Sequence, residues 1–278
     1  MIAIVGGLGA ALAWAATTLC SARASRTIGA LPTLAWVMLV GLVPAVPAVL
    51  AAGGDPPRGS ALGWLAASGF GNVAGLGLVY AAVRHGKIGV VAPIASTEGA
   101  VAAVMAVVLG EHLSAGVGTT LGVVVVGIVV AAAARGTEGR TPRRSVVLAC
   151  GAALSFGVSI YATGRASQEL SIAWAILPAR AVGAAFISIP LALTQRLALT
   201  RPAAPFVVVT GLAEVGGFAS YAVGARHGIA IAAVLGSQFA AIAALGALVL
   251  YRERLNRAQV AGVAVIAVGV AALSGLRA

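Results

Sequence analysis

Arg84-His85-Gly86 begins an apolar stretch of this chain that ends at Glu111-His112-Leu113. The same frame returns at Arg226-His227-Gly228 and ends at Glu253-Arg254-Leu255, a shift of 142 positions (84 to 226). A charged tripeptide and a Glu-x-Leu motif that recur at one fixed shift indicate an internal repeat. The sequence therefore predicts a protein made of two copies of one unit.

The composition of the chain is that of a membrane protein. Hydrophobic residues make up 60% and charged residues 9% of the sequence, and the mean hydropathy is +1.05, values far from those of soluble domains. The first apolar segment is long enough to span a bilayer, so we interpret it as a span and not as a cleavable signal peptide. We expect a multi-pass protein of the cell membrane, in contact with the lipid bilayer.

The net charge of +11 does not indicate a nucleic-acid partner. The Lys and Arg residues stand singly or in small groups between apolar runs, which is typical of topology signals at a membrane surface. We therefore expect no nucleic acid among the partners of this protein.

Apolar runs of roughly 18 to 25 residues, the length that crosses a hydrocarbon layer about 30 Å thick, occur ten times. The predicted spans are 2–22, 31–51, 61–83, 88–109, 115–134, 145–166, 173–194, 203–225, 229–251 and 258–276. Gly53-Gly54-Asp55-Pro56-Pro57 separates the second span from the third, and the polar loop 135–144 lies at the midpoint.

Five spans in each copy make the repeat an inverted one, because an odd number brings the second copy into the membrane from the opposite face. The correspondence runs without a net gap, and Arg23-Ala24-Ser25 matches Arg165-Ala166-Ser167. The predicted fold is an all-α integral membrane protein with ten transmembrane helices, arranged as a five-plus-five inverted repeat around a central cavity. We place the two repeats at 1–137 and 138–278. Alternatively, duplication only builds a larger bundle, but the repeated charged tripeptide disfavours this reading.

These motifs resemble the drug/metabolite transporter superfamily, in its ten-span EamA-like branch. The resemblance covers almost the whole chain and rests on Val91-Ala-Pro93-Ile-Ala-Ser-Thr97, Gly110-Glu111-x-Leu113 and Tyr251-Arg-Glu253-Arg-Leu255. It implies a carrier whose central cavity is formed by spans one to four and six to nine. Members move amino acids, nucleotide sugars, sugar phosphates, choline-like cations and drugs, so the resemblance leaves the cargo open. Leu235 stands where the first copy has Pro93, which predicts a helix irregularity in one half only.

Polar side chains in the middle of the predicted spans are the candidate functional groups, because they are costly in lipid and normally face the bundle interior. They are Glu98, Arg180, Glu214, Ser237 and Gln238, together with Asn72 and Ser96 at the positions equivalent to Glu214 and Gln238. Burial disfavours the charged form of a carboxyl group, so Glu98 and Glu214 are candidates for proton coupling, and Arg180 for binding a carboxylate or phosphate. Alternatively, Arg180 forms a buried ion pair with Glu214 or Glu98 that only holds helices together.

Aromatic side chains complete the predicted substrate site. Trp14 and Phe156 are equivalent positions of the two copies, and Tyr80, Tyr161 and Tyr221 are further candidates. Rings beside a carboxylate favour an organic ammonium group through cation–π attraction. An amino acid would satisfy a Glu and an Arg together.

No pattern in the sequence indicates a metal site, a cofactor or an enzyme. Cys20 and Cys150 lie at non-equivalent positions, the histidines lie at span ends, and no His-Glu-x-x-His occurs. An intramembrane enzyme is therefore the weakest alternative. A passive channel is distinguished from a carrier by unitary currents in place of saturable counter-transport. We expect Glu111 and Glu253 to be structural, each capping the helix that follows it.

Two indications of the orientation disagree. The loops after odd-numbered spans hold thirteen Lys or Arg and those after even-numbered spans hold four, which places both termini outside by the positive-inside rule. The family resemblance implies that both termini lie inside, and a cytoplasmic reporter fused to Ala278 would decide between them.

The predicted function is that of a secondary transporter, a monomer or homodimer, that moves a small amphipathic metabolite or drug such as an amino acid or organic cation. We expect export by alternating access with proton coupling. Uptake of a choline-like cation is the alternative within the same class.

Overall fold

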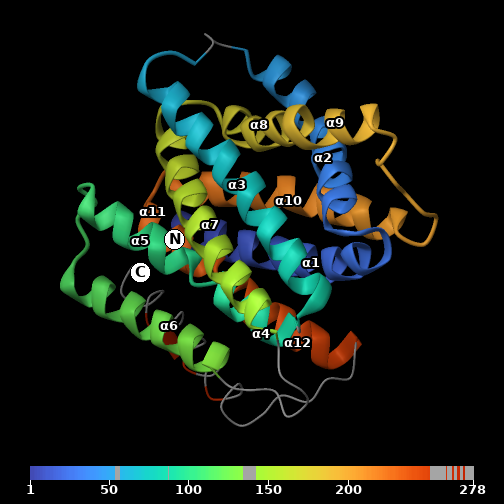
Figure 1. Cartoon of the computed structure of the whole chain (residues 1–278). Coiled ribbons are helices and arrows are strands. Elements are labelled where there is room, and N and C mark those ends of the chain that lie inside the picture. The colour runs from blue at the N-terminus through green and yellow to red at the C-terminus, as the bar shows by residue number, and fades with distance from the viewer. Residues whose placement is uncertain are drawn as a thin grey trace.

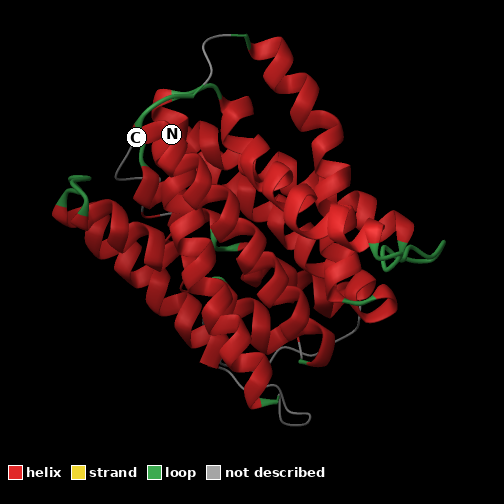
Figure 2. Ribbon diagram, turned by 45° about the horizontal axis from the view of Figure 1, so that its top comes forward, coloured by secondary structure: helices red, strands yellow, loops and turns green. Residues whose placement is uncertain are grey.

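The computed structural model describes residues 1–53, 57–86, 88–133 and 142–250 and, beyond these, a few single residues of the last segment. The described residues form helices and contain no strand (Figure 2). In chain order, the helices are α1 (Ile2–Ile28), α2 (Ala30–Ala52), α3 (Ser60–His85), α4 (Ile88–Ala95), α5 (Glu98–Val108), α6 (Ala115–Ala133), α7 (Arg143–Glu169), α8 (Ile172–Gly183), the π-helix η1 (Ala184–Ser188), α9 (Ile189–Leu193), α10 (Ala204–Ala225), α11 (Ile229–Gly236) and α12 (Phe239–Leu250) (Figure 1).

Six helical stretches of the described chain are long and apolar enough to cross a membrane. They are α1, α2, α3, α7, the continuous segment from α8 to α9, and α10, and they coincide with predicted spans one, two, three, six, seven and eight. The apolar α6 covers most of the fifth predicted span. The motif Tyr251-Arg-Glu253-Arg-Leu255 and, apart from a few single residues, the tenth predicted span lie outside the described residues.

The fourth and ninth predicted spans are not continuous helices. Each is broken near its middle, at Ser96-Thr97 between α4 and α5 and at Ser237-Gln238 between α11 and α12. The prediction that only the half with Pro93 would be irregular is therefore wrong.

Hydroxyl side chains stand at both breaks, including the one that has no proline. The Thr97 hydroxyl donates to the carbonyl oxygen of Ile94 at 2.8 Å, and the Ser237 hydroxyl donates to that of Val234 at 2.7 Å. A Ser or Thr that bonds a backbone carbonyl within the preceding turn competes with the helical ladder and bends the helix. Since a hydroxyl residue stands at each break, Leu235 does not have to be proline for the ninth span to bend.

The main packing joins the two repeats to each other. In Figure 1, α1 lies beside α10, and α3 lies beside α7. Small residues allow the close approach, since a Cβ atom on Gly6 would lie 2.6 Å from the Cα of Gly224, and one on Gly71 would lie 2.8 Å from the carbonyl oxygen of Ser155. The 142-residue shift turns the pair α1/α10 into the pair α7/α3, so the two interfaces are images of each other.

The broken helices cross at the same level. A Cβ atom on Gly99, the second residue of α5, would lie 2.6 Å from the carbonyl oxygen of Ala233 in α11. Glycine therefore permits α5 and α11 to touch backbone to backbone next to both breaks.

Two faces of the molecule are used below. The N-terminal face is where α1 and α3 begin and where α7 and α10 end. The opposite face is where α1 and α3 end and where α7 and α10 begin (Figure 1). Each repeat thus presents its helices to a given face in the reverse sense of the other, as an inverted repeat requires.

Candidate functional site

A cavity lies between the paired helices, at the level of the broken spans. It has a volume of about 40 Å³, room for a few water molecules. Its walls come from α1, α3, α4, α5, α7, α10 and α12, which belong to predicted spans one, three, four, six, eight and nine. The lining residues are Trp14, Thr17, Thr18, Ser21, Asn72, Leu76, Val79, Tyr80, Val83, Val91, Ala92, Ala95, Glu98, Phe156, Ile160, Glu214, Phe218 and Phe239.

The pseudo-two-fold axis of the repeat passes through this cavity. Four pairs of positions related by the 142-residue shift face it together: Trp14 with Phe156, Thr18 with Ile160, Asn72 with Glu214, and Leu76 with Phe218. Equivalent positions of an inverted repeat can share one cavity only where the axis crosses it. The cavity is therefore the meeting point of the two halves, where secondary transporters built this way bind substrate.

A buried ion pair stands at one side of the cavity. The Nη2 of Arg180 in α8 lies 3.2 Å from Oε2 of Glu214, and the Arg180 side chain has an exposed fraction of 0%. The same nitrogen lies 3.5 Å from Oδ1 of Asn72, and the Phe218 ring centroid is 5.9 Å from the guanidinium carbon. The structural alternative for Arg180, an ion pair with Glu214, is thus present, and its partner is Glu214 and not Glu98.

The long side chain of Arg180 reaches this position past α2. A Cβ atom on Gly41 would lie 2.6 Å from the Cδ of Arg180, so glycine leaves the path open. Met38, the equivalent of Arg180 in the first repeat, lies against Gly183 in α8. The positive charge of Arg180 therefore has no counterpart at the equivalent position of the first repeat.

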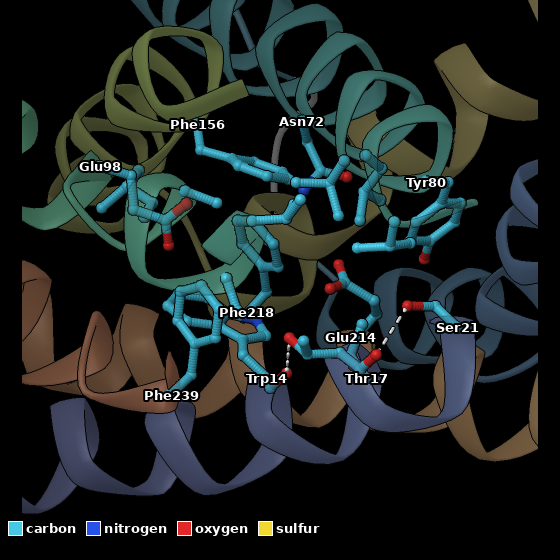
Figure 3. Close-up of a pocket in the computed structure, with 18 residues that line it drawn as sticks. Trp14, Thr17, Ser21, Asn72, Tyr80, Glu98, Phe156, Glu214, Phe218 and Phe239 are labelled. Atoms are coloured by element: carbon cyan, nitrogen blue, oxygen red, sulfur yellow. Dashed lines mark hydrogen bonds between the residues drawn. The ribbon is translucent and has the colours of Figure 1, made fainter. Parts of the chain in front are cut away.

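The second carboxylate has different surroundings. Glu98 begins α5, directly after the break, and has an exposed fraction of 4%. Among the described residues, its carboxylate has no ion pair and no hydrogen bond. Figure 3 shows Glu98 and Glu214 at different sides of the cavity, with the aromatic side chains Phe156 and Phe218 between them.

Several buried hydrogen-bond donors around the cavity have no partner within the described chain. They are Trp14 Nε1, Asn72 Nδ2, Tyr80 Oη and Thr17 Oγ1 on the cavity wall, and Nε and Nη1 of Arg180 behind it. Buried polar groups are normally hydrogen-bonded, and exceptions call for an explanation such as a ligand. This set of donors is suited to an acceptor group, for example a carboxylate.

Half of the predicted substrate-site residues line the cavity, namely Trp14, Asn72, Tyr80, Glu98, Phe156 and Glu214. Arg180 does not line the cavity, but it pairs with Glu214, which does. Ser96, Ser237 and Gln238 are buried at the helix breaks, where Nε2 of Gln238 donates to the Val234 carbonyl at 2.9 Å. Tyr161 packs edge-on against Trp64 at 5.7 Å, and the Tyr221 hydroxyl donates to the Ile160 carbonyl at 2.9 Å.

Sequence reasoning missed a polar stripe of α1. Thr17, Thr18 and Ser21 line the cavity together with Trp14. They follow Trp14 by three, four and seven residues, which is the spacing of one helix face, and this signal was present in the sequence. Phe218 and Phe239 were also missed, because single aromatic residues in apolar runs carry no pattern of their own.

Glu111 does cap a helix, but not the one that follows it. Its carboxylate oxygens accept hydrogen bonds from the backbone N–H of Ala230 at 3.3 and 3.2 Å. Ala230 lies in the first turn of α11, in the other repeat. The expectation for Glu111 is corrected accordingly, and Glu253 lies outside the described residues.

No group of three or more His, Cys, Asp or Glu side chains in the described part of the chain could hold a metal ion. Cys20 and Cys150 are free.

Comparison with known proteins identifies the family. The model of the EamA-like transporter family matches the chain twice, at residues 1–133 and at residues 143–275. A solved crystal structure of a protein with 20% sequence identity has a TM-score of 0.76, covering 99% of this chain and 96% of that one. At that identity the likeness concerns the fold alone. No curated protein matches the chain.

Proposed function

Since the chain belongs to the EamA-like transporter family and is a multi-pass membrane transporter, we propose that it is a secondary carrier of a small amphipathic metabolite or drug. The observation that carries this proposal is the cavity on the pseudo-two-fold axis, with one unpaired carboxylate, one ion-paired carboxylate and an arginine around it. Alternating access about that axis would expose the cavity to each side of the membrane in turn.

The side chains around the cavity favour a substrate with an ammonium group. Glu98 supplies a negative charge, and Trp14, Phe156 and Phe218 supply ring faces that attract cations. An amino acid additionally has a carboxylate, which the unpaired donors of Arg180 and Asn72 would bind. A choline-like cation would need only Glu98 and the rings, and uptake of such a cation is the second candidate.

Proton coupling follows from the competition between cation and proton for one carboxylate. An unpaired charge is costly to bury, so a buried carboxylate without a partner is stabilised by binding either a cation or a proton. If Glu98 binds one at a time, a proton that enters from the side to which the cavity is open releases the substrate to that same side, and the proton is then carried across the membrane in the opposite direction to the substrate. Export with proton exchange is the direction we propose.

A ligand screen followed by a transport assay tests this proposal. We expect the purified protein to show a raised melting temperature with amino acids or quaternary amines, and no shift with phosphorylated sugars. The stabilising ligand should then show saturable counter-transport in proteoliposomes, driven by a proton gradient. Unitary currents without counter-transport would replace the carrier by a channel, and stabilisation by phosphorylated sugars alone would overturn the substrate class.

A further inference from the structure

Two helix pairs form the walls of the cavity, and each pair is held together by specific contacts. The first pair is α1/α10, where the Ser220 hydroxyl donates to the carbonyl oxygen of Gly6 at 2.9 Å. The second pair is α3/α7, where the Ser159 hydroxyl donates to the carbonyl oxygen of Ser68 at 2.8 Å. Because side-chain bonds within each pair add to close backbone packing, each pair behaves as one unit.

A cation–π contact fixes one end of each pair. The guanidinium carbon of Arg23 lies 5.6 Å from the ring centroid of Phe206 in the first pair, and that of Arg165 lies 5.9 Å from Trp64 in the second. The 142-residue shift converts Arg23 into Arg165 and Trp64 into Phe206, so the two contacts are images. The same stabilising contact is therefore present within both pairs, and we expect motion to occur between the two pairs and not within them.

The two pairs are joined tightly at the N-terminal face. The Arg226 side chain, at the end of α10, donates from Nε to the carbonyl oxygen of Ser167 at 2.6 Å and from Nη2 to that of Leu170 at 2.5 Å. Both acceptors lie at the end of α7, where helix carbonyls have no partner within the helix and attract cations. The hydrogen bond from Tyr221 to Ile160 joins the same two helices one turn deeper.

The join at the opposite face is of the same kind but looser. Arg26, near the end of α1, donates from Nε to the carbonyl oxygen of Val83 and from Nη2 to that of Gly86, both at 3.4 Å. These acceptors lie at the end of α3. The cavity extends toward this face, since Ser21, Val83 and Val91 are among its lining residues.

We propose that Arg226 and Arg26 are the latches of the two faces of the carrier, each holding one face closed when its two bonds are short. In the conformation described, the Arg226 latch is closed and the Arg26 latch is loose. Rocking of the two pairs about the cavity lengthens one set of bonds while it shortens the other. This inference rests on the proposed carrier function and assigns its gates.

The location of the latches suits this role. Arg26 and Arg226 are both exposed at the faces, away from the cavity, so water replaces the carbonyl oxygens when a latch opens. They are positioning residues and do not contact the substrate. Arg84, the positional equivalent of Arg226, is exposed as well and makes none of the latch bonds within the described chain, which makes it a matched control.

Thiol labelling of the full-length protein in vesicles of both orientations tests the latches. Cys20 and Cys150 are replaced by alanine, and Thr18→Cys on the cavity wall is the reporter for a membrane-impermeant maleimide. For Arg226→Gln we expect labelling from the N-terminal face to rise roughly threefold to tenfold, and labelling from the opposite face to fall. For Arg26→Gln we expect the reverse change, and for Arg84→Gln no change.

Arg226→Lys keeps the charge but cannot bond both carbonyls, and should give a smaller shift in the same direction. It also provides the measurement if Arg226→Gln does not purify. Unchanged labelling in the Arg226 variants, or a change of the same sign in the Arg26 and Arg226 variants, would overturn the latches. Labelling needs no substrate, so a clear opposite shift without counter-transport of any ligand would contradict the carrier function and leave the latches standing.

Discussion

Glu214 and Glu98 face one cavity, but within the described chain only Glu214 has a buried cation beside it. Removing one member of a buried ion pair leaves the other charge uncompensated, which costs about 3 to 5 kcal/mol. We therefore expect Glu214→Gln to lower the free energy of unfolding by about 3 kcal/mol and Glu98→Gln to change it much less. Thermal unfolding of both variants in detergent measures this difference, and equal losses would contradict it.

Arg180→Met restores the residue that the first repeat has at the equivalent position, Met38. Combined with Glu214→Gln it removes both charges of the pair, and replacing a buried pair by neutral groups is often neutral in stability. The double variant should thus unfold at a higher temperature than Glu214→Gln alone. A melting temperature below that of the single variant would show that Arg180 holds more of the structure than its pair with Glu214.

Glu98 is the residue to which we assign the coupling of substrate to protons. Glu98→Gln keeps the shape of the side chain but cannot exchange a proton, so we expect counter-transport to lose its response to an imposed proton gradient. The comparison is with Gln238→Ala, which changes a buried polar residue at the other break. A Glu98→Gln variant that still responds to the gradient would end the coupling proposal.

At the scale of elements, the crossing of α5 and α11 depends on a single missing side chain. Gly99→Ala places a methyl group 2.6 Å from the Ala233 carbonyl oxygen, and overpacking of this kind typically costs about 1 to 3 kcal/mol. The control is Gly122→Ala in α6, where nothing lies within 4 Å and helix propensity favours alanine. Melting curves should show a loss for the first variant and none for the second.

The long helices could be predicted from the sequence, but the two helix breaks could not. The apolar runs predicted the six long spans to within a few residues, because the length of a run reflects the thickness of the membrane directly. The exception is α1, which continues to Ile28. The breaks in the fourth and ninth spans were not predicted as a symmetric pair. A hydroxyl that bonds the carbonyl three residues earlier occurs at both breaks, but also at Ser21 and Ser167 inside the continuous helices α1 and α7, so a Ser or Thr in an apolar run does not by itself predict a break.

At the scale of the molecule, each repeat packs chiefly against the other repeat. Because α1 lies beside α10 and α3 beside α7, each half expressed alone would expose the helix faces that it buries against the other half. We expect residues 1–137 or 138–278 expressed alone to be degraded or aggregated, and the two halves expressed together to copurify through a tag on one of them. A single half that melts cooperatively by itself would contradict this dependence.

The sequence by itself determined that the chain is a membrane protein, that it consists of two repeats of one unit, and that its polar interior residues are few. These properties follow from local composition and from matching positions, which need no knowledge of how helices are rotated. The tertiary structure decided that Arg180 pairs with Glu214 and not with Glu98, because helix rotation and tilt set which buried charges meet. It also decided which face is tightly joined, by the short bonds of Arg226 against the long bonds of Arg26. The two arginines are not equivalent positions of the repeat, since the 142-residue shift turns Arg226 into Arg84 and Arg26 into Gln168, so matching positions in the sequence could not predict these contacts.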